Sequence, residues 1–355
     1  MKLYRQIDRN EASIYMQIIA QNTGNVNIIL TNTPEKENKR PEIKCDKWTE
    51  HRKETQRVAE EKIKYISMPR YYRMRECGTL LNVEFCKDCG AYHVRSTNLC
   101  RDRFCPTCNW RLSLQRYADL SRLFKELYLA KPELITTFVT LTVQNCKPEE
   151  LNNTMKRMSK AWTMTLKRRG LQRIVAGTAR SVEVTYNKLT KTFHPHFHIM
   201  IVWNENIGND ETATSANASF ISEWLISALR CDLKADIKAQ HGTKLYGEEA
   251  RAEESGKTFT SLARAITETF KYSFKSKQLD DMPLNVFRIF AEEFAGKRLV
   301  SFTGIVKEYA KLCNVNTEEV EENETKVCSE CGSAQLDKII YQWSFGTNAF
   351  EALTT

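Results

Sequence analysis

The chain has 355 residues, 12 cysteines and a formal net charge of +9. Its 41% hydrophobic and 27% charged residues are typical of a globular protein, and its length allows about two domains. No apolar run of about 18 residues occurs, which excludes a membrane-spanning helix, and the polar start MKLYRQIDRNEAS predicts no signal peptide. We therefore expect a cytoplasmic protein with reduced cysteines, many of them metal ligands. The positive charge suggests a polyanionic partner.

Two segments are expected before the main domain. Residues 1–66 form an N-terminal segment, partly a polar linker and partly a highly charged, solvated helix over 48–66. Residues 67–125 form a basic module that contains six cysteines, with 11 lysines and arginines against five acids between positions 70 and 125. Spacings of three and four predict a helix at its end, with a buried stripe of Leu114, Tyr117, Ser121, Phe124 and Leu127.

Strand patterns dominate the expected catalytic domain, residues 126–310. The β-branched, alternating segment ITTFVTLTV predicts a strand over 135–143. Two further alternating segments, SVEVTY at 181–186 and HFHIMIVW at 196–203, are joined by a short polar loop. This arrangement predicts a β-hairpin.

Helices and linkers are expected around these strands. Residues 151–175 predict one helix, whose seven lysines and arginines without any acid favour phosphate contact over simple solvation. An Asn-, Thr- and Ala-rich loop is expected over 204–218, followed by helices over 221–229 and 262–276. Residues 311–355 are expected to form an acidic linker and a small, separate module with a Cys-x-x-Cys sequence.

The sequence HPHFH places His194, His196 and His198 on one face of a strand, because side chains alternate along a strand. His196 and His198 lie about 7 Å apart along it and can bind one ion from the same side. Glu183 on the partner strand can supply a third ligand. Two imidazoles and a carboxylate suit a divalent ion such as Mg²⁺, Mn²⁺ or Zn²⁺. The alternative is a set of surface histidines.

A second candidate group lies in ITETFKYSFKSK, where Glu268 precedes Tyr272 by four residues and Lys275 follows it by three. Residues at these spacings share a helix face. A tyrosine beside a carboxylate and a cation is suited to nucleophilic chemistry on a phosphate. Taken alone, the same pattern also fits an exposed helix face.

Several segments together resemble the rolling-circle plasmid replication initiator (Rep) family of the HUH (His–hydrophobic–His) endonuclease superfamily, single-tyrosine type. The resemblance covers roughly residues 45–310. The segments that carry it are ECGTLL (76–81), CRDRFCPTC (100–108), FVTLTVQN (138–145), VEVTYN (182–187), HPHFH (194–198), Glu268 with KYSFK (271–275), and KRLVSFTGIVKE (297–308). It implies an α+β fold, in which an HUH core with a central antiparallel sheet is flanked by helices.

The resemblance also implies an activity. Such proteins nick one strand of a plasmid origin, as single-stranded DNA or an extruded hairpin, and start rolling-circle replication with a host helicase and DNA polymerase. Tyr272 would attack the scissile phosphate, leaving a 5′-phosphotyrosine and a free 3′-OH, while His196, His198 and Glu183 hold Mg²⁺ or Mn²⁺. Glu268 would activate water for the terminating cleavage. Lys275 would be a supporting cation.

The cysteines predict a zinc-ribbon-like module before this core. Cys86-x-x-Cys89 and Cys105-x-x-Cys108 are two knuckles whose thiolates favour a structural Zn²⁺ over free thiols. Cys77, Cys100 and His93 are alternative ligands. Arginines near them suit phosphate contact, so we expect the module to grip origin DNA; these are Arg95, Arg101 and Arg103.

A further knuckle, Cys328-x-x-Cys331, lacks a second half nearby in the sequence. Cys313 could contribute, two chains could share a metal, or the knuckle could bind nothing. Three other cysteines are expected to be inert: Cys45, Cys146 and Cys231.

One apparent nucleotide motif is excluded. SGKT at 255–258 resembles the end of a P-loop, but Arg251 occupies the position of the first required glycine. Within the same chemistry, a transposase or mobilisation relaxase is the alternative to a replication initiator. From a different class, a non-catalytic, zinc-dependent DNA-binding regulator would explain the charge and cysteines, but not the order of the histidines, glutamates and Tyr272.

Overall fold

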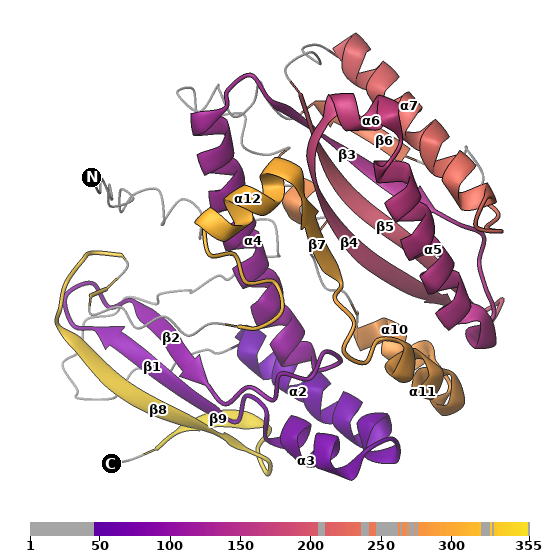
Figure 1. Cartoon of the computed structure of the whole chain (residues 1–355). Helices are drawn as coiled ribbons and strands as arrows, with labels where there is room; N and C mark the ends of the chain where they lie inside the picture. Colours follow the sequence, from indigo (N-terminus) through magenta and orange to yellow (C-terminus); the bar gives the residue numbers. More distant parts are fainter. Residues whose placement is uncertain are drawn as a thin grey trace. The chain divides into compact units, whose positions relative to one another are not determined.

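The chain divides into two compact units, one of residues 1–110 with 320–355 and the other of residues 111–319 (Figure 1). Each unit contains an antiparallel sheet and helices, which confirms the expected α+β class. The structure is a computed structural model that describes residues 46–204, 210–235, 241–245, 262, 265–267, 269, 274, 276–320, 327–328 and 330–353. None of the helices in these ranges is long and apolar enough to cross a membrane.

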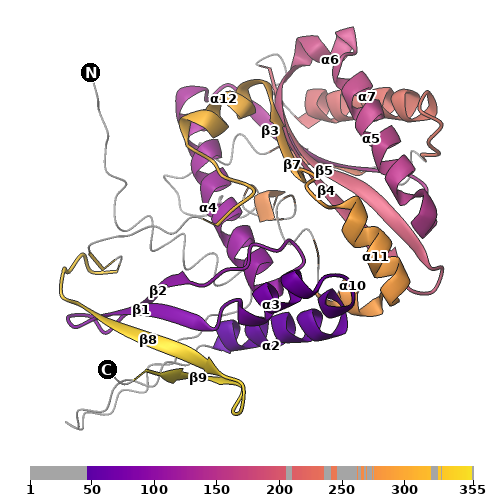
Figure 2. The ribbon, with the colours of Figure 1, turned by 60° about the horizontal axis from the view of Figure 1, so that its bottom comes forward.

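The sheet of the first unit is built from both ends of the chain. Its strands are β1 (Leu80–Cys86), β2 (Tyr92–Thr97), β8 (Leu336–Ser344) and β9 (Ala349–Ala352). Their order is β2-β1-β8-β9, and all neighbours are antiparallel. Figure 2 shows the yellow β8 lying beside β1. The C-terminal segment is therefore not the separate module expected from its sequence, because its strands pair with the N-terminal hairpin.

Three helical segments accompany this sheet: α2 (Asp46–Glu61), η1 (Ile63–Tyr65) and α3 (Met68–Glu76). The charged helix α2 is not simply solvated, since one face buries Arg52, Thr55 and Val58. The Arg52 guanidinium lies 5.6 Å from the ring centroid of Trp343 and donates a hydrogen bond to the carbonyl oxygen of Arg75. The contact with the aromatic ring and the hydrogen bond help to stabilise the buried guanidinium of Arg52.

Helix α4 (Pro106–Ala130) contains the boundary between the two units. Tyr117, Ser121, Phe124 and Leu127 are buried, as the three-and-four spacing predicts, but Leu114, the first residue of the expected stripe, is only partly buried. The division falls between Trp110 and Arg111, whereas the sequence suggested a boundary after residue 125. The sequence did not reveal this boundary because it lies inside one continuous amphipathic helix, where the amino-acid composition does not change.

The second unit has a five-stranded sheet of order β6-β3-β5-β4-β7, with antiparallel neighbours throughout. Its strands are β3 (Ile135–Thr142), β4 (Val175–Asn187), β5 (Thr192–Trp203), β6 (His241–Leu245) and β7 (Val300–Thr303). The strands β4 and β5 form the predicted hairpin, and both are longer than their alternating cores suggest.

Helices lie on both faces of this sheet (Figure 1). They are α5 (Leu151–Leu166), α6 (Arg169–Ile174), α7 (Asp210–Leu229), α10 (Ser276–Asp281), α11 (Leu284–Glu293) and α12 (Gly304–Leu312), with a short η2 (Pro148–Glu150). Helices α5 and α7 pack on one face, where the Phe197 ring lies 6.2 Å from that of Trp162 and 5.8 Å from that of Trp224. On the opposite face, the Tyr128 hydroxyl of α4 donates to the Thr136 hydroxyl.

Two helix predictions need correction. The single helix expected over 151–175 is broken at Arg168, whose extended backbone (ψ 125°) separates α5 from α6. The Nε of Arg168 lies 2.5 Å from Oε2 of Glu223, so one of the seven cations is paired with an acid. The expected loop over 204–218 instead contains the start of α7, because buried Ala213 and Ala216 continue its apolar face.

A close backbone crossing fixes the edge of the sheet beside β4. Gly304, which begins α12, has φ +53°, and a Cβ placed on it would lie 2.0 Å from the carbonyl oxygen of Ala176. Gly177 faces the same crossing, with a Cβ position 2.7 Å from the Thr303 carbonyl oxygen. Only glycine fits this conformation and this approach without displacing main chain.

Candidate functional site

The hairpin of β4 and β5 brings Glu183, His196 and His198 together on the face of the sheet opposite α5 and α7. Glu183 is paired directly with His196 across the two strands, and His198 is paired with Ser181. The Nε2 atoms of His198 and His196 lie 2.9 Å and 3.4 Å from the same Glu183 oxygen. The three ligand atoms all lie within 4.8 Å of one another, so the group could hold a metal ion.

Burial and hydrogen bonding determine the charge of Glu183. Burial would raise its pKa, but hydrogen bonds from His196 and His198 outweigh burial and hold the pKa well below its ordinary value. The side chains of Glu183 and His198 are only 10% and 12% exposed. A buried carboxylate that remains ionised, together with the two imidazoles beside it, is a donor set suited to a divalent cation.

Neighbouring groups orient the two imidazoles. Nδ1 of His198 lies 3.2 Å from the Thr140 hydroxyl, and its ring stacks on that of Phe138 with centroids 5.6 Å apart. Nδ1 of His196 lies 3.2 Å from the carbonyl oxygen of His194. Both rings therefore turn Nε2 toward Glu183. Sequence reasoning missed Thr140, although its place in the alternating strand β3, opposite His198, was a usable signal.

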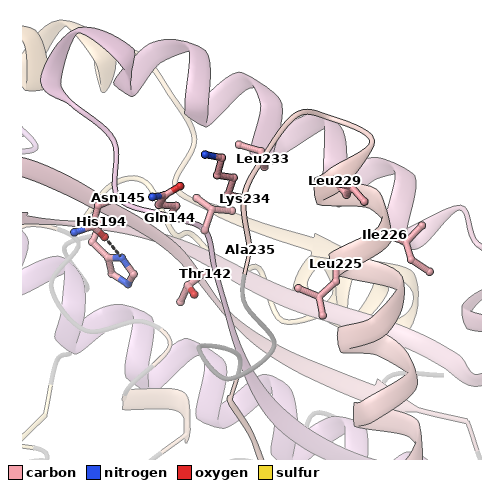
Figure 3. Close-up of a pocket in the computed structure, with 11 residues that line it drawn as sticks. Thr142, Gln144, Asn145, His194, Leu225, Ile226, Leu229, Leu233, Lys234 and Ala235 are labelled. Atoms are coloured by element: carbon pink, nitrogen blue, oxygen red, sulfur yellow. Dashed lines mark hydrogen bonds between the residues drawn. The ribbon is translucent and has the colours of Figure 1, made fainter.

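His194 does not join the candidate metal ligands. Its Nδ1 lies 2.8 Å from Oδ1 of Asn145, and burial together with the neighbouring His196 lowers its pKa. It lines a pocket of about 1130 Å³ (Figure 3), and its ring centroid lies 5.3 Å from that of the candidate metal ligand His196. The remaining lining residues are Thr142, Val143, Gln144, Asn145, Leu225, Ile226, Leu229, Leu233, Lys234 and Ala235.

This pocket has a polar side and an apolar side. In Figure 3, His194, Asn145 and Gln144 stand at one end with Lys234, while the leucines and isoleucine of α7 stand at the other. The backbone N–H of Gln144 donates to the carbonyl oxygen of Lys234 at 2.7 Å, which joins the segment after β3 to the segment after α7 at the polar end. Ile226 and Leu229 are exposed, so the apolar side of the pocket is accessible from solvent.

The predicted catalytic residues Tyr272, Glu268 and Lys275 lie outside the described residues. The chain is described on both sides of Tyr272. The Ser181 hydroxyl of β4 donates to the carbonyl oxygen of Thr269, and Ser181 shares its strand face with Glu183. The ring of Phe274 packs against Phe290 of α11, with centroids 5.3 Å apart.

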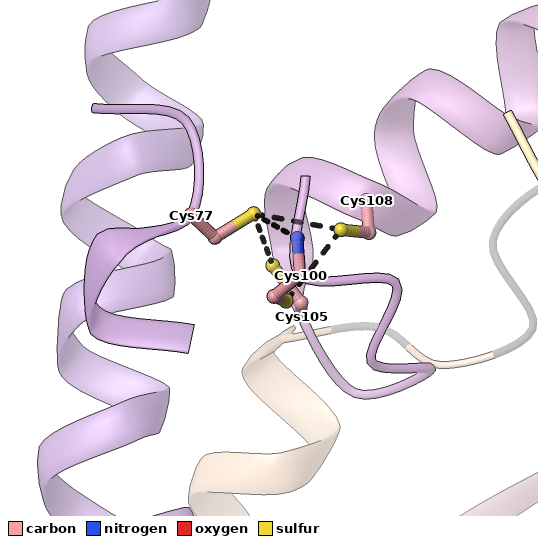
Figure 4. Close-up of side chains that lie close together, drawn as sticks. All are labelled: Cys77, Cys100, Cys105 and Cys108. Carbon is pink, nitrogen blue, oxygen red and sulfur yellow. Dashed lines mark hydrogen bonds between the residues drawn. The ribbon is translucent and has the colours of Figure 1, made fainter. Parts of the chain in front are cut away.

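Four cysteines form one cluster in the first unit, in which Cys100 is partly exposed and the other three are buried (Figure 4). The sulfur of Cys77 lies 3.5 Å from those of Cys105 and Cys108, and the sulfurs of Cys100 and Cys108 are 3.7 Å apart. Burial would raise the pKa of Cys105, but hydrogen bonds from the other three thiols lower it well below its ordinary value. The same contacts raise the pKa of Cys100. Such a group could hold a metal such as zinc.

The remaining knuckle cysteines form a second cluster. Cys86 and Cys89 group with Cys328 and Cys331, not with Cys105 and Cys108 as the sequence suggested. The two alternative ligands Cys77 and Cys100 take the vacant places beside Cys105 and Cys108. The third alternative, His93, has its Nε2 3.7 Å from the sulfur of Cys328. The C-terminal half-site is thus completed within the same chain.

Further predicted positions are the arginines that were expected to contact phosphate and the cysteines that were expected to be inert. Arg95, expected to contact phosphate, pairs with Glu84, whose Oε2 lies 2.5 Å from its Nε. Cys146 and Cys231 are buried, while Cys45 and the SGKT segment lie outside the described residues. Arg101 and Arg103 belong to the loop that precedes the helix carrying Cys108.

Comparison with known proteins decides the family. The family model described as "Replication protein" matches residues 91–350. The chain belongs to this replication protein family. A protein named "Protein rep" from Lentilactobacillus hilgardii is 28% identical over 268 residues, 74% of this chain and 81% of that protein. Another from Lactiplantibacillus plantarum is 26% identical over 325 residues, 87% of this chain and 96% of that protein.

A third "Protein rep", from Streptococcus pneumoniae serotype 2, is 28% identical over 254 residues, 70% of this chain and 73% of that protein. No solved structure matches the chain. The matches confirm the Rep resemblance and a role in replication initiation, which implies contact with origin DNA.

Proposed function

We propose that this Rep protein is a metal-dependent endonuclease and strand transferase that nicks one strand of a plasmid origin to start rolling-circle replication. The observation that carries the proposal is the Glu183, His196 and His198 group, assembled by β4 and β5 with ligand atoms within 4.8 Å. Bound Mg²⁺ or Mn²⁺ would polarise the scissile phosphate and offset the negative charge that develops during attack. The protein would act in the cytoplasm, where plasmid DNA is replicated.

The assigned nucleophile is the hydroxyl of Tyr272. Its oxygen forms a bond to phosphorus and gives up the phenolic proton to water, while the bond from phosphorus to the 3′ oxygen breaks and that oxygen takes up a proton from water. The products are a 5′-phosphotyrosine and a 3′-OH, which a host polymerase extends while a host helicase unwinds the duplex. The contact between Ser181 and Thr269 supports this assignment, since Tyr272 follows Thr269 by three residues. Three residues of chain span at most about 11 Å.

The pocket beside the metal group suits the single strand next to the nick. Lys234 and the polar groups of Gln144 and Asn145 match a phosphate and sugar, while Ile226 and Leu229 offer apolar contact to a base. A DNA strand bound in this pocket would have its sugar–phosphate backbone close to His194, and therefore close to the candidate metal ligands. This proposal gives a role to the exposed side chains of Ile226 and Leu229, which lie in the same pocket as these polar groups.

Further assignments complete the proposal. Glu268 activates water for the terminating cleavage, and Lys275 stabilises charge at the phosphate. The cluster of Cys77, Cys100, Cys105 and Cys108 binds one structural Zn²⁺, because four thiolates in a closed, buried group are the usual structural zinc site. The same unit would contact the duplex part of the origin.

The deciding experiment uses an end-labelled, single-stranded origin oligonucleotide and Mn²⁺. We expect a covalent protein–DNA adduct on a denaturing gel that is lost in Tyr272→Phe and retained in the control Tyr186→Phe. Glu183→Gln should lose the adduct while retaining oligonucleotide binding. An adduct that persists in Tyr272→Phe would show that another residue is the nucleophile. Origin binding without any cleavage by the wild type would favour the non-catalytic regulator.

A second measurement tests the role of Glu268. In Glu268→Ala the first nick should survive, because Tyr272 does not need a water molecule for it, while hydrolytic termination should fail. The readout is the fraction of circles released from a plasmid template after one round. Loss of the first nick would contradict the water-activating role.

A further inference from the structure

The two Cys-x-x-Cys-Gly sequences at opposite ends of the chain adopt the same turn. In each, the glycine N–H donates to the carbonyl oxygen of the first cysteine at 2.9 Å, in Gly90 to Cys86 and in Gly332 to Cys328. Both glycines have φ +74°, a conformation that L side chains rarely adopt. The N–H of each first cysteine donates to a carbonyl oxygen five residues later, at 2.9 Å and 2.7 Å.

These two turns bring four sulfurs face to face. The sulfur of Cys86 lies 3.5 Å from that of Cys331, and the sulfur of Cys89 lies 3.6 Å from that of Cys328. All four are free thiols. A tetrahedral Zn²⁺ with bonds of about 2.3 Å holds its thiolates about 3.8 Å apart. The sulfur separations therefore match a metal site and are far longer than a disulfide bond.

Further contacts hold the two turns together. The backbone N–H of Lys87 donates to the carbonyl oxygen of Gln335 at 3.0 Å, and its Nζ lies 2.9 Å from Oδ1 of Asp337. Directly beyond these contacts, β8 pairs with β1 from Cys86 opposite Leu336 to Leu80 opposite Gln342. The cluster thus lies at the end of the ladder that joins the two ends of the chain.

The two cysteine clusters differ in exposure. In the first cluster, Cys77, Cys105 and Cys108 are buried, and Cys105 is 0% exposed. In the second cluster, Cys89 and Cys331 are exposed, although Cys86 and Cys328 are buried. Thiol reagents and chelators reach exposed sulfurs first, so the two sites differ in how readily they can lose a bound ion.

We propose that Cys86, Cys89, Cys328 and Cys331 bind a second Zn²⁺, which clasps the C-terminal strands onto the N-terminal hairpin and exchanges more readily than the first. Bringing together two segments so distant in sequence has an entropic cost that grows with the length of chain between them. A metal with two ligands from each segment offsets that cost, because binding occurs only when both are in place. Loss of this ion would loosen β8 and β9 and leave the first cluster intact. The clasp does not depend on the nuclease activity proposed above.

The test uses the full-length protein purified without added chelator. Elemental analysis should give about two zinc ions per chain, and the chelator EDTA should release them in two phases. The variant Cys328→Ser/Cys331→Ser should contain about one zinc and lack the fast phase. The matched control Cys313→Ser, which changes a cysteine outside both clusters, should keep both ions and both phases.

A second measurement works on the wild type alone, in case the double variant fails to fold. After the fast phase, hydrogen exchange should increase in β1 and β8 but not in β4 and β5, and N-ethylmaleimide should label Cys89 and Cys331 before Cys105. A single zinc that persists in the double variant would overturn the proposal. So would simultaneous release of both ions, or unchanged exchange in β8 after the fast phase.

Discussion

Thr140 offers the sharpest test of the metal group, because it touches a predicted ligand without being one. Its hydroxyl lies 3.2 Å from Nδ1 of His198. When Nδ1–H donates to this hydroxyl, the Nε2 lone pair is left for a cation beside Glu183. Thr140→Val keeps the β-branched shape that suits a strand but removes the acceptor. The side chain of His198 is only 12% exposed, so water cannot freely replace the lost partner.

The expected magnitude follows from that burial. Leaving a buried N–H without a partner costs about 1–3 kcal/mol. At about 1.4 kcal/mol per tenfold change, this corresponds to roughly a 5- to 150-fold loss of metal affinity. Mutations of outer-shell partners of metal-binding histidines have effects of a similar size. The stacked ring of Phe138 still holds the imidazole plane, so the ring should remain in place and bind metal more weakly.

The assay is a Mn²⁺ titration of oligonucleotide nicking, with calorimetric measurement of Mn²⁺ binding beside it. In Thr140→Val, half-maximal activity should need a 5- to 150-fold higher Mn²⁺ concentration, by the same estimate, and saturating metal should restore most of the rate. Thr140→Ser retains the hydroxyl and serves as the control. Unchanged Mn²⁺ affinity in the valine variant, or an equal loss in the serine variant, would refute the role assigned to this hydrogen bond.

The remaining predictions address stability, pH and DNA binding. Gly304→Ala should lower the free energy of unfolding by at least about 2 kcal/mol, because it adds strain at positive φ and a main-chain clash. Gly296→Ala, also at positive φ but with open space around it, should cost clearly less in the same urea titration; equal losses would contradict the clash. The lowered pKa of Glu183 means that its contribution to metal-free stability is complete above its ordinary value of about 4.3 and is lost as pH falls below it. Glu183→Gln should therefore flatten the acid side of the melting-temperature profile, and an unchanged slope would count against the ion pair. Lys234→Gln and Ile226→Ser should each weaken single-stranded oligonucleotide binding by roughly fivefold, about 1 kcal/mol, in a fluorescence anisotropy titration. Unaltered affinity in both variants would contradict the proposal that this pocket binds the DNA strand.

The alternating sequence pattern correctly predicted the β4–β5 hairpin and the strand face that carries the histidines. Alternation fixed the hairpin of β4 and β5, and the same alternation placed His196 and His198 on one face. Glu183 was expected opposite them, and the register pairs it with His196. These inferences succeed because a strand has a two-residue period and a short hairpin loop leaves few choices of register.

The cysteine grouping could not be found in this way. Each knuckle is a complete local motif, and nothing in its spacing states which other pair of thiols completes the site. Cys86 and Cys89 lie close to Cys105 in the sequence, but β1 pairs with β8 and brings Cys328 and Cys331 to them instead. The pairing is a property of the sheet, which the sequence alone did not reveal.

The start of α7 was missed for a different reason. Its composition of Asn, Thr and Ala resembles a loop, but Ala213, Ala216, Phe220 and Trp224 recur at spacings of three and four and are all buried. Small alanines carry little hydrophobic signal, so the periodic face was overlooked where its members are smallest. Thr140 was missed similarly, because a threonine in a strand is usually unremarkable.

The order in which the chain is synthesised gives the sheet of the first unit a particular consequence. Domains usually fold as units from the N-terminus while the ribosome is still adding residues. Here the second unit is one continuous segment, residues 111–319, whereas β1 in the first unit pairs with β8, which follows that segment in the sequence. The unit whose translation begins first is therefore the last to complete its sheet. A chain that ended before Cys328 would contain the whole second unit, but the edge of β1 that pairs with β8 would be open.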